Sequence, residues 1–187
     1  MSEPTSIPAD LVARLRQAQR VAVLTGAGIS AESGVPTFRQ AQTGLWARYD
    51  PQQLATPQAF RRQPQLVWDW YAWRRSLVVG AKPNPGHFAL AEMERRAPHF
   101  TLITQNVDSL HHRAGSRAVL ELHGNIARTK CSREGHVIET WPETDERPPH
   151  CPDCGAFLRP DVVWFGESLP ADALDAAIVA ARPAEVF

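Results

Sequence analysis

The stretch Val21-Ala-Val-Leu-Thr-Gly26-Ala-Gly28-Ile-Ser30-Ala-Glu-Ser-Gly34-Val-Pro-Thr-Phe-Arg39 decides the fold, because a short apolar strand runs into a glycine turn that opens a helix. Gly26 and Gly28 lack the Cβ atoms that would keep a phosphate from the backbone, and N–H groups at a helix start attract negative charge. The third glycine comes later than in the usual dinucleotide pattern. The stretch therefore predicts a dinucleotide site, with an ordinary α/β turn as the plainer interpretation. The polar, broken run after Gly34 is interpreted as a flap over the ligand.

The composition is that of an ordinary soluble protein. The 187 residues are 43% hydrophobic and 21% charged, which allows one main domain and a small module. Twenty basic residues balance twenty acidic ones, so we expect neither a nucleic-acid nor a membrane partner. The polar first residues and the lack of a long apolar run predict a cytoplasmic protein. Three cysteines, two of them in Cys151-Pro-Asp-Cys154, favour a metal over a disulfide framework.

Strand-like and helical patterns alternate along the chain. Apolar runs predict strands at 21–25, 100–104, 118–122 and 162–165, and helical patterns cover 8–19, 84–96 and 171–181. Alternation of this kind predicts an α/β fold with a Rossmann-like parallel sheet, built from residues 1–124 and 161–187. Residues 125–160 are rich in Pro, Cys, His and charge, which indicates a small inserted module.

The end of the sequence looks like the start of another strand. Residues 184–187 would leave an unpaired sheet edge after the helix at 171–181. We therefore expect the sheet to be incomplete at the C-terminus and the chain to be a truncated fragment.

Polar side chains follow two of the predicted strands. Gln105, Asn106 and Asp108 come directly after the strand at 100–104, and His123 follows the strand at 118–122. The carboxyl ends of parallel strands are where ligands bind in such folds. A lone histidine at a strand end is also often structural, and His111 is a weaker candidate than His123.

Four motifs in this order resemble the sirtuin family. They are Gly26-Ala-Gly-Ile-Ser30 with Gly34-Val-Pro-Thr-Phe-Arg39, Thr104-Gln-Asn-Val-Asp108, His123-Gly124 and Arg159-Pro-Asp-Val-Val-Trp-Phe-Gly-Glu167. The resemblance implies an NAD-dependent protein lysine deacylase with a zinc-ribbon-like module at 125–160. It also implies which residues bind NAD: Gly26, Ala27, Gly28, Ser30, Thr37, Phe38, Arg39, Gln105, Asn106 and Asp108.

The resemblance also implies a mechanism. In sirtuins the acyl-lysine carbonyl oxygen attacks C1′ of the nicotinamide ribose as nicotinamide leaves, and a ribose hydroxyl then attacks the acyl carbon. His123 would be the catalytic base for that hydroxyl, a role that suits an imidazole because its ordinary pKa is about 6.5. The products would be free lysine, nicotinamide and O-acyl-ADP-ribose. An inactive NAD-binding remnant and a mono-ADP-ribosyltransferase are the alternatives.

Two segments would bind the acylated lysine of a protein substrate. Val163, Trp164, Phe165 and Gly166 match the sirtuin segment on which the substrate peptide lies as an added strand, although an ordinary core strand would read the same way. Tyr71 and Arg74 are three residues apart on one helix face. They resemble the motif of the sirtuins that remove succinyl, malonyl or glutaryl groups, so we expect desuccinylation to be preferred over deacetylation. The plainer interpretation is that the aromatic residues of the segment 68–75 are core residues and that its two arginines are solvated.

Sirtuins typically hold a structural zinc with two Cys-x-x-Cys pairs, and this chain departs from that pattern. Cys151 and Cys154 form one pair, whereas Cys131 is followed by Glu134 where its partner would fall. The expected ligands are Cys131, Cys151 and Cys154. The fourth is open among His136, His150, Glu134 and water.

Overall fold

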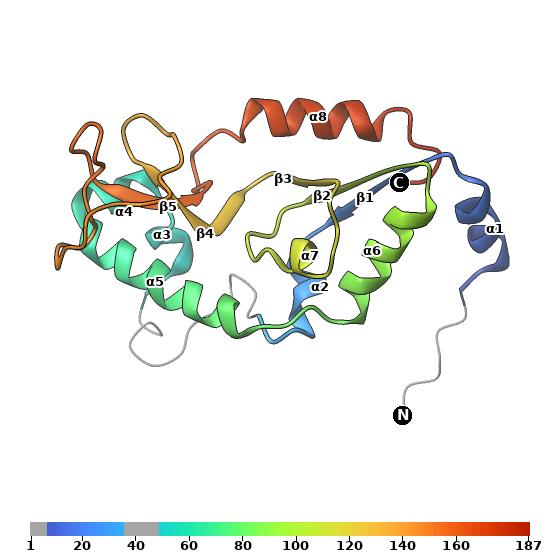
Figure 1. Ribbon diagram of the computed structural model, residues 1–187, viewed down its shortest axis with the longest axis horizontal. Coiled ribbons are helices and arrows are strands. Elements are labelled where there is room, and N and C mark those ends of the chain that lie inside the picture. Colours follow the sequence, from blue (N-terminus) through green and yellow to red (C-terminus); the bar gives the residue numbers. More distant parts are fainter. Residues whose placement is uncertain (1–6, 36–48) are drawn as a thin grey trace.

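The computed structural model describes residues 7–35 and 49–187, whose elements form two groups side by side (Figure 1). The first group is built on a parallel sheet with strand order β1-β2-β3. These strands are β1 (Arg20–Thr25), β2 (His99–Thr104) and β3 (Val119–Glu121), at the places that the apolar runs predicted. Their parallel pairing brings the three carboxyl ends to one edge.

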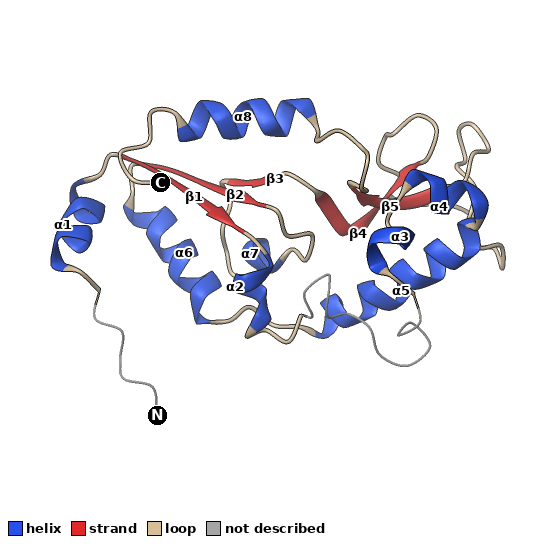
Figure 2. Ribbon diagram, turned by 180° about the vertical axis from the view of Figure 1, so that it is seen from behind, coloured by secondary structure: helices blue, strands red, loops and turns tan. Residues whose placement is uncertain are grey.

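Helices cover both faces of this sheet, as Figures 1 and 2 show. The helix α8 (Ala171–Ala181) crosses one face, and α2 (Ala27–Ala31), α6 (Pro85–Arg96) and α7 (Leu110–Arg113) lie on the other. The helix α1 (Ala9–Gln17) precedes β1. A parallel sheet between two layers of helices is the doubly wound α/β arrangement, so the predicted fold class is confirmed.

The helix α6 begins where the sequence predicts it. The Asn84 side chain accepts hydrogen bonds from the backbone N–H groups of Gly86 and His87, which have no partner inside the helix. Pro85 occupies the first helical position, where a missing N–H costs nothing. The cap fixes the start of the helix, and with it the place of His87 under the sheet edge.

The second group contains a two-stranded antiparallel sheet and three helices. Its strands are β4 (Gly124–Cys131) and β5 (Leu158–Val162). The helices α3 (Pro51–Leu54), α4 (Pro57–Arg62) and α5 (Pro64–Gly80) pack around them (Figure 1). The core here includes Val67, Trp70 and Tyr71, so α5, the helix that carries Tyr71 and Arg74, packs its aromatic residues into the core.

The strand predicted at 162–165 is wrong. β5 ends at Val162, and it pairs antiparallel with β4 rather than joining the parallel sheet. After Val162 the backbone finds other partners, because Trp164 N–H donates to the Glu167 carboxylate and Phe165 N–H donates to the Ala55 carbonyl. These bonds draw the chain out of the ladder. Of the apolar side chains that suggested a strand, Val162 and Trp164 lie in the core beside α5, whereas Phe165 is exposed.

Residues near position 186 lie beside β1. Val186 forms a parallel bridge with Val21, and the Val186 carbonyl accepts a hydrogen bond of 3.0 Å from Ala22 N–H. The strand-like pattern at 184–187 therefore adds to the parallel sheet as a short bridge.

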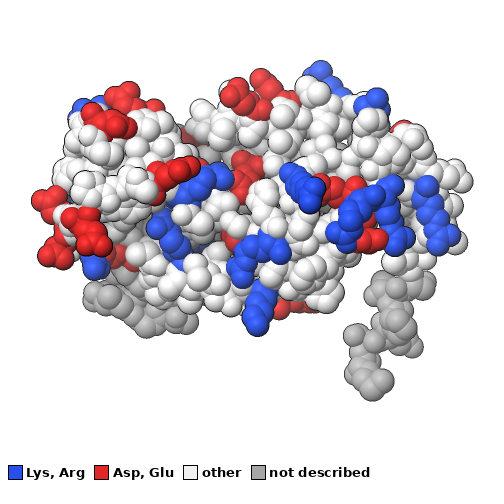
Figure 3. All heavy atoms as spheres, viewed as in Figure 1, with Lys and Arg blue, Asp and Glu red and all other residues white. Residues whose placement is uncertain are grey.

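Two surface properties bear on possible partners. Basic and acidic side chains are interspersed over the face seen in Figure 3, and neither sign forms a continuous field there. Among the described helices, none is both long and apolar enough to cross a bilayer.

Candidate functional site

A cavity of about 510 Å³ opens at the carboxyl ends of the parallel strands, between the two groups of elements. It brings together most of the residues that the sequence singled out. These are Ala27, Ser30, Tyr71, Arg74, Gln105, Asn106, Asp108, His123, Val163, Trp164, Phe165 and Gly166. Thr37, Phe38 and Arg39, with the predicted flap around them, lie outside the described residues.

In the glycine turn, Ala27 lines this cavity, whereas Gly26 and Gly28 on either side of it do not. Among the described residues, a Cβ atom on Gly28 would meet nothing within 4 Å, and one on Gly26 would meet only the Gln105 side chain at 4.0 Å. Residues 7–35 and 49–187 therefore leave space beside the backbone of the turn that a ligand can enter. This is the space that a bound dinucleotide needs, so the residues present fit NAD.

A buried polar chain forms one wall of the cavity. Ser30 Oγ donates a hydrogen bond of 2.7 Å to Asp108 Oδ2, and Asn106 Nδ2 donates to Ser30 Oγ at 3.1 Å. Asn106 Nδ2 also donates to the Gly26 carbonyl at 2.9 Å, which ties β2 to the glycine turn of β1. Since each side chain is held by another element, the wall is formed before any ligand arrives.

Two buried histidines support this wall, and sequence reasoning missed one and undervalued the other. His87 Nδ1 accepts from Asn84 N–H at 3.3 Å, which leaves the proton on Nε2, 3.5 Å from Ser30 Oγ. The rings of His87 and His111 lie 4.9 Å apart, and His111 Nε2 lies 2.9 Å from Thr25 Oγ1. Burial lowers the pKa of both rings, that of His111 to about 4, so they stay neutral at pH 7.

His123 is placed as a base. Its Nδ1 lies 2.9 Å from the Gln105 carbonyl oxygen, which can only accept, so the ring proton resides on Nδ1. The Nε2 lone pair is then left to accept a proton, and His123 lines the cavity. The segment before it pairs with β2, and the His123 carbonyl accepts from Val163 N–H at 2.9 Å. The ring is therefore oriented by the sheet edge itself.

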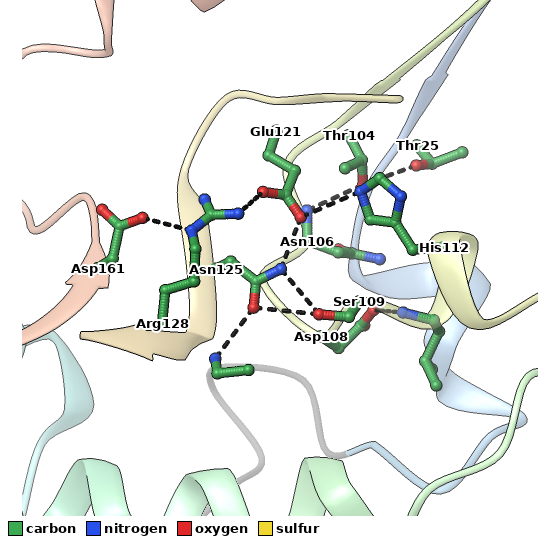
Figure 4. A network of polar contacts seen from close by, with 12 residues as sticks. Thr25, Thr104, Asn106, Asp108, Ser109, His112, Glu121, Asn125, Arg128 and Asp161 are labelled. Carbon is green, nitrogen blue, oxygen red and sulfur yellow. Dashed lines mark hydrogen bonds and ion pairs between the residues drawn. The ribbon is translucent and has the colours of Figure 1, made fainter. Parts of the chain in front are cut away.

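Figure 4 shows a chain of ion pairs formed by Glu121, Arg128 and Asp161. Glu121 precedes His123 in the sequence, and the other two residues follow it. The Glu121 carboxylate binds Arg128 at 2.7 Å and accepts from Asn125 Nδ2 at 2.7 Å. Arg128 also binds Asp161 at 2.8 Å, so β3, β4 and β5 are joined by charges. The network anchors both flanks of His123.

The glycine after His123 is required by close packing. Gly124 has φ of 76°, and a Cβ atom there would lie 2.3 Å from the Asp161 carbonyl oxygen. Any side chain would force β4 and β5 apart. The pair His123-Gly124 thus combines a chemical group with the backbone turn that places it.

Tyr71 and Arg74 of α5 line the cavity. Tyr71 Oη accepts a hydrogen bond of 3.0 Å from Trp164 Nε1, and the Arg74 guanidinium lies 4.9 Å from the centroid of the Trp70 ring. Burial raises the pKa of Tyr71 to about 12, so the phenol keeps its proton. Burial lowers the pKa of the Arg74 guanidinium, which reflects the cost of desolvating a cation. An anionic group in the cavity would offset that cost.

The segment after β5 already uses its backbone donors. Val163 N–H donates to His123, Trp164 N–H to Glu167 and Phe165 N–H to Ala55. A peptide that paired with this segment would therefore meet mainly its carbonyl oxygens.

The three cysteines form one cluster. Their sulfur atoms all lie within 4.8 Å of one another, and Cys131 Sγ is 3.4 Å from Cys154 Sγ. Tetrahedral zinc with Zn–S bonds of about 2.3 Å places sulfurs about 3.8 Å apart, so the donor set fits zinc. Burial raises the pKa of the Cys131 thiol, but backbone N–H groups of Glu134 and Arg133 outweigh it and bring the pKa to about 7. A thiolate is the form that binds zinc.

The candidates for a fourth ligand differ in their surroundings. His136 forms a second cluster with Cys151 and Asp153, within 4.8 Å, and its Nε2 lies 2.9 Å from Asp153. His150 uses both ring nitrogens locally, on the Gly155 carbonyl and on Glu146. Of the two histidines, His136 is therefore the one that lies near a cluster cysteine.

We expect the purified protein to contain about one zinc per chain when neither zinc nor chelator is added. Cys154→Ser should lower this content, because a hydroxyl is a poor zinc ligand, whereas His150→Ala should not. Elemental analysis by mass spectrometry measures the content. Well-folded wild-type protein that contains no metal would refute the zinc site.

The cavity also contains residues to which the sequence assigned no role. They are Val35, Gln52, Ala55, Val78, Val107, Val162, Glu167 and Leu169. Four of them, Val35, Val107, Val162 and Glu167, lie inside the quoted motifs, but the motifs gave them no separate role. Gln52, Ala55, Val78 and Leu169 lie outside every motif.

The comparisons with known proteins agree with this site. The sequence matches the Sir2 family over residues 26–187. It is 56% identical to the NAD-dependent protein deacylase of Aquifex aeolicus over 168 residues, 89% of this chain and 70% of that protein. It is 52% identical to NAD-dependent protein deacylase 1 of Pseudomonas aeruginosa over 179 residues, 91% of this chain and 72% of that protein.

Solved structures give the same result. The crystal structure of a Sir2 homolog–NAD complex aligns with a TM-score of 0.83 and 48% identity, covering 96% of this chain and 70% of that one. Sir2 bound to acetylated peptide aligns with a TM-score of 0.77 and 33% identity, covering 91% of this chain and 69% of that one. Motifs, fold and relatives therefore agree, and the chain belongs to the Sir2 family, the sirtuins.

Proposed function

We propose that the protein removes acyl groups from protein lysines in an NAD-dependent reaction. The observation that carries this proposal is that His123, with its Nε2 free to accept a proton, lines the same cavity as Ser30, Asn106 and Asp108. Relatives at 50–56% identity are named NAD-dependent protein deacylases, which supports it. The likeness to a Sir2 protein bound to acetylated peptide supports an acylated protein as substrate.

The residues around the glycine turn would hold the dinucleotide. Gly26, Ala27 and Gly28 offer a backbone without bulky side chains, and Asn106 and Asp108 offer polar atoms beside it. When bound, NAD supplies an electrophilic ribose carbon whose nicotinamide can leave, and a ribose hydroxyl that can take over the acyl group. Asp108 accepts from Ser30 and from Leu110 N–H, so its carboxylate is fixed in one orientation.

His123 would act on the ribose hydroxyl. Its Nε2 would accept the proton of that hydroxyl, while Nδ1 would keep its hydrogen bond to the Gln105 carbonyl. The carbonyl also stabilises the imidazolium that results, because a charged donor strengthens that bond.

Tyr71 and Arg74 would select the acyl group. A guanidinium and a phenol in the wall of a largely apolar cavity suit an acyl chain that ends in a carboxylate, as in succinyl, malonyl and glutaryl groups. An acetyl group has no carboxylate for these two side chains to bind. We therefore propose that acidic acyl groups are removed in preference to acetyl.

The peptide carrying the lysine would lie along Val163–Gly166.

The three thiols, which form no disulfide, suit a reducing compartment, and we propose that the protein lies in the cytoplasm.

The test is a product analysis with purified protein, a succinyl-lysine peptide and its acetyl counterpart, with and without NAD. Mass spectrometry should find unmodified peptide, nicotinamide and O-acyl-ADP-ribose only when NAD is present. A protein acceptor carrying ADP-ribose, with the acyl group still on the peptide, would favour mono-ADP-ribosyl transfer. Acyl loss that does not need NAD would contradict the proposal.

A further inference from the structure

Trp164 connects Tyr71, which lines the cavity, to the partly buried ion pair of Arg159 and Glu167. Its side chain is 2% exposed, and its indole Nε1–H donates to Tyr71 Oη at 3.0 Å across 93 positions of sequence. Phe60 packs beside it, with ring centroids 5.2 Å apart. The indole is therefore locked in the core, with its one polar atom on the phenol.

The ion pair holds Trp164 in this position. Arg159 binds both carboxylate oxygens of Glu167, at 2.6 and 2.9 Å, and donates to the Val162 carbonyl at 2.8 Å. Glu167 Oε2 in turn accepts from Trp164 N–H at 2.8 Å. The Arg159 guanidinium carbon lies only 3.3 Å from the centroid of the indole. Backbone and ring of Trp164 are thus fixed by the same two charged residues.

This contact has a chemical consequence for Tyr71. A phenol oxygen that accepts the indole hydrogen must send its own hydrogen elsewhere. Tyr71 lines the cavity together with Arg74, one helical turn away. Accepting one hydrogen bond also makes a hydroxyl a stronger donor for the next one.

We propose that Trp164, held by Arg159 and Glu167, is a positioning residue that directs the Tyr71 hydroxyl toward the carboxylate end of an acidic acyl group. This inference rests on the proposed function of the cavity and deepens it. Tyr71 and Arg74 touch the acyl group, whereas Trp164 acts through Tyr71.

The test is a double-mutant cycle with Trp164→Phe and Tyr71→Phe. The readout is the ratio of kcat/KM for succinyl-peptide to kcat/KM for acetyl-peptide, which a general loss of activity does not change. Trp164→Phe keeps an aromatic ring and deletes the donor, so the ratio should fall about three- to tenfold, mainly through KM for the succinyl-peptide. In the Tyr71→Phe background it should cause no further fall.

Two further variants make the cycle specific. Trp68→Phe makes the same change beside the cysteine cluster, outside the cavity, and should leave the ratio unchanged. Arg159→Lys keeps the indole but loses the paired hydrogen bonds and the flat contact with the ring. It should lower the ratio, again only when Tyr71 is present, and it provides the test if Trp164→Phe does not fold.

The outcomes separate the two proposals. A wild-type protein without succinyl preference overturns both the acyl preference and this inference. If wild type prefers succinyl and Tyr71→Phe lowers the ratio, an unchanged ratio in Trp164→Phe overturns the inference alone. The inference is also overturned if Trp164→Phe lowers the ratio by the same factor in the wild-type and in the Tyr71→Phe background.

Discussion

Replacing His123 by alanine is expected to lower NAD-dependent acyl removal by about 10²- to 10⁴-fold, the usual worth of a positioned general base. Nδ1 bonded to the Gln105 carbonyl leaves Nε2 as the proton acceptor in the cavity. Alanine has no group that accepts a proton. His87 and His111 do not replace the imidazole, because both are buried and face other partners. Steady-state rates with acetyl- and succinyl-peptides measure the effect.

His99→Ala is the matched control, since His99 is an exposed histidine at the start of β2 and does not line the cavity. It should retain wild-type rates. Circular dichroism and a thermal midpoint close to that of wild type should show that His123→Ala is folded. A folded His123→Ala with rates like those of the control would remove the catalytic role.

Arg74→Met is expected to lower the succinyl-to-acetyl ratio of kcat/KM by about 10- to 100-fold. A hydrogen bond between charged groups contributes about 1.5–3 kcal/mol, and methionine keeps much of the length and volume without the charge. The acetyl group carries no carboxylate, so the loss falls on the succinyl-peptide. Competition between the two peptides in one reaction measures the ratio directly.

Arg75→Met is the control for this change. Arg75 is the next residue of α5, but its Nε donates to the Ile126 carbonyl at 2.8 Å, and it does not line the cavity. Its replacement should leave the ratio unchanged, whatever it does to stability. The acyl preference would be wrong if Arg74→Met and Arg75→Met gave the same ratio.

Local signals in the sequence were enough for the parallel sheet. β1 and β2 are mainly apolar runs with polar residues at their carboxyl ends, and Asn84-Pro85 marks the start of α6 by its own chemistry. These features depend on neighbours within a few positions, so they can be predicted without knowing the rest of the fold.

Other features depend on contacts between distant residues, and the sequence did not reveal them. Val162–Phe165 has the composition of a strand, but Glu167 and Ala55 capture its backbone N–H groups. The bond from Trp164 to Tyr71 and the place of His87 beneath Ser30 likewise join residues far apart in the chain. The motifs contain most of the residues that line the cavity, whereas Ala55, Val78 and Leu169 lie outside them and had no signal in the sequence.

The most direct test of the account compares two rates in His123→Ala with an acylated peptide present. One is the exchange of labelled nicotinamide into NAD, and the other is the loss of the acyl group from the peptide. Because the imidazole accepts a proton after nicotinamide has left, exchange should continue while acyl loss falls by about 10²-fold or more. Acyl loss that keeps its wild-type proportion to exchange would contradict the account.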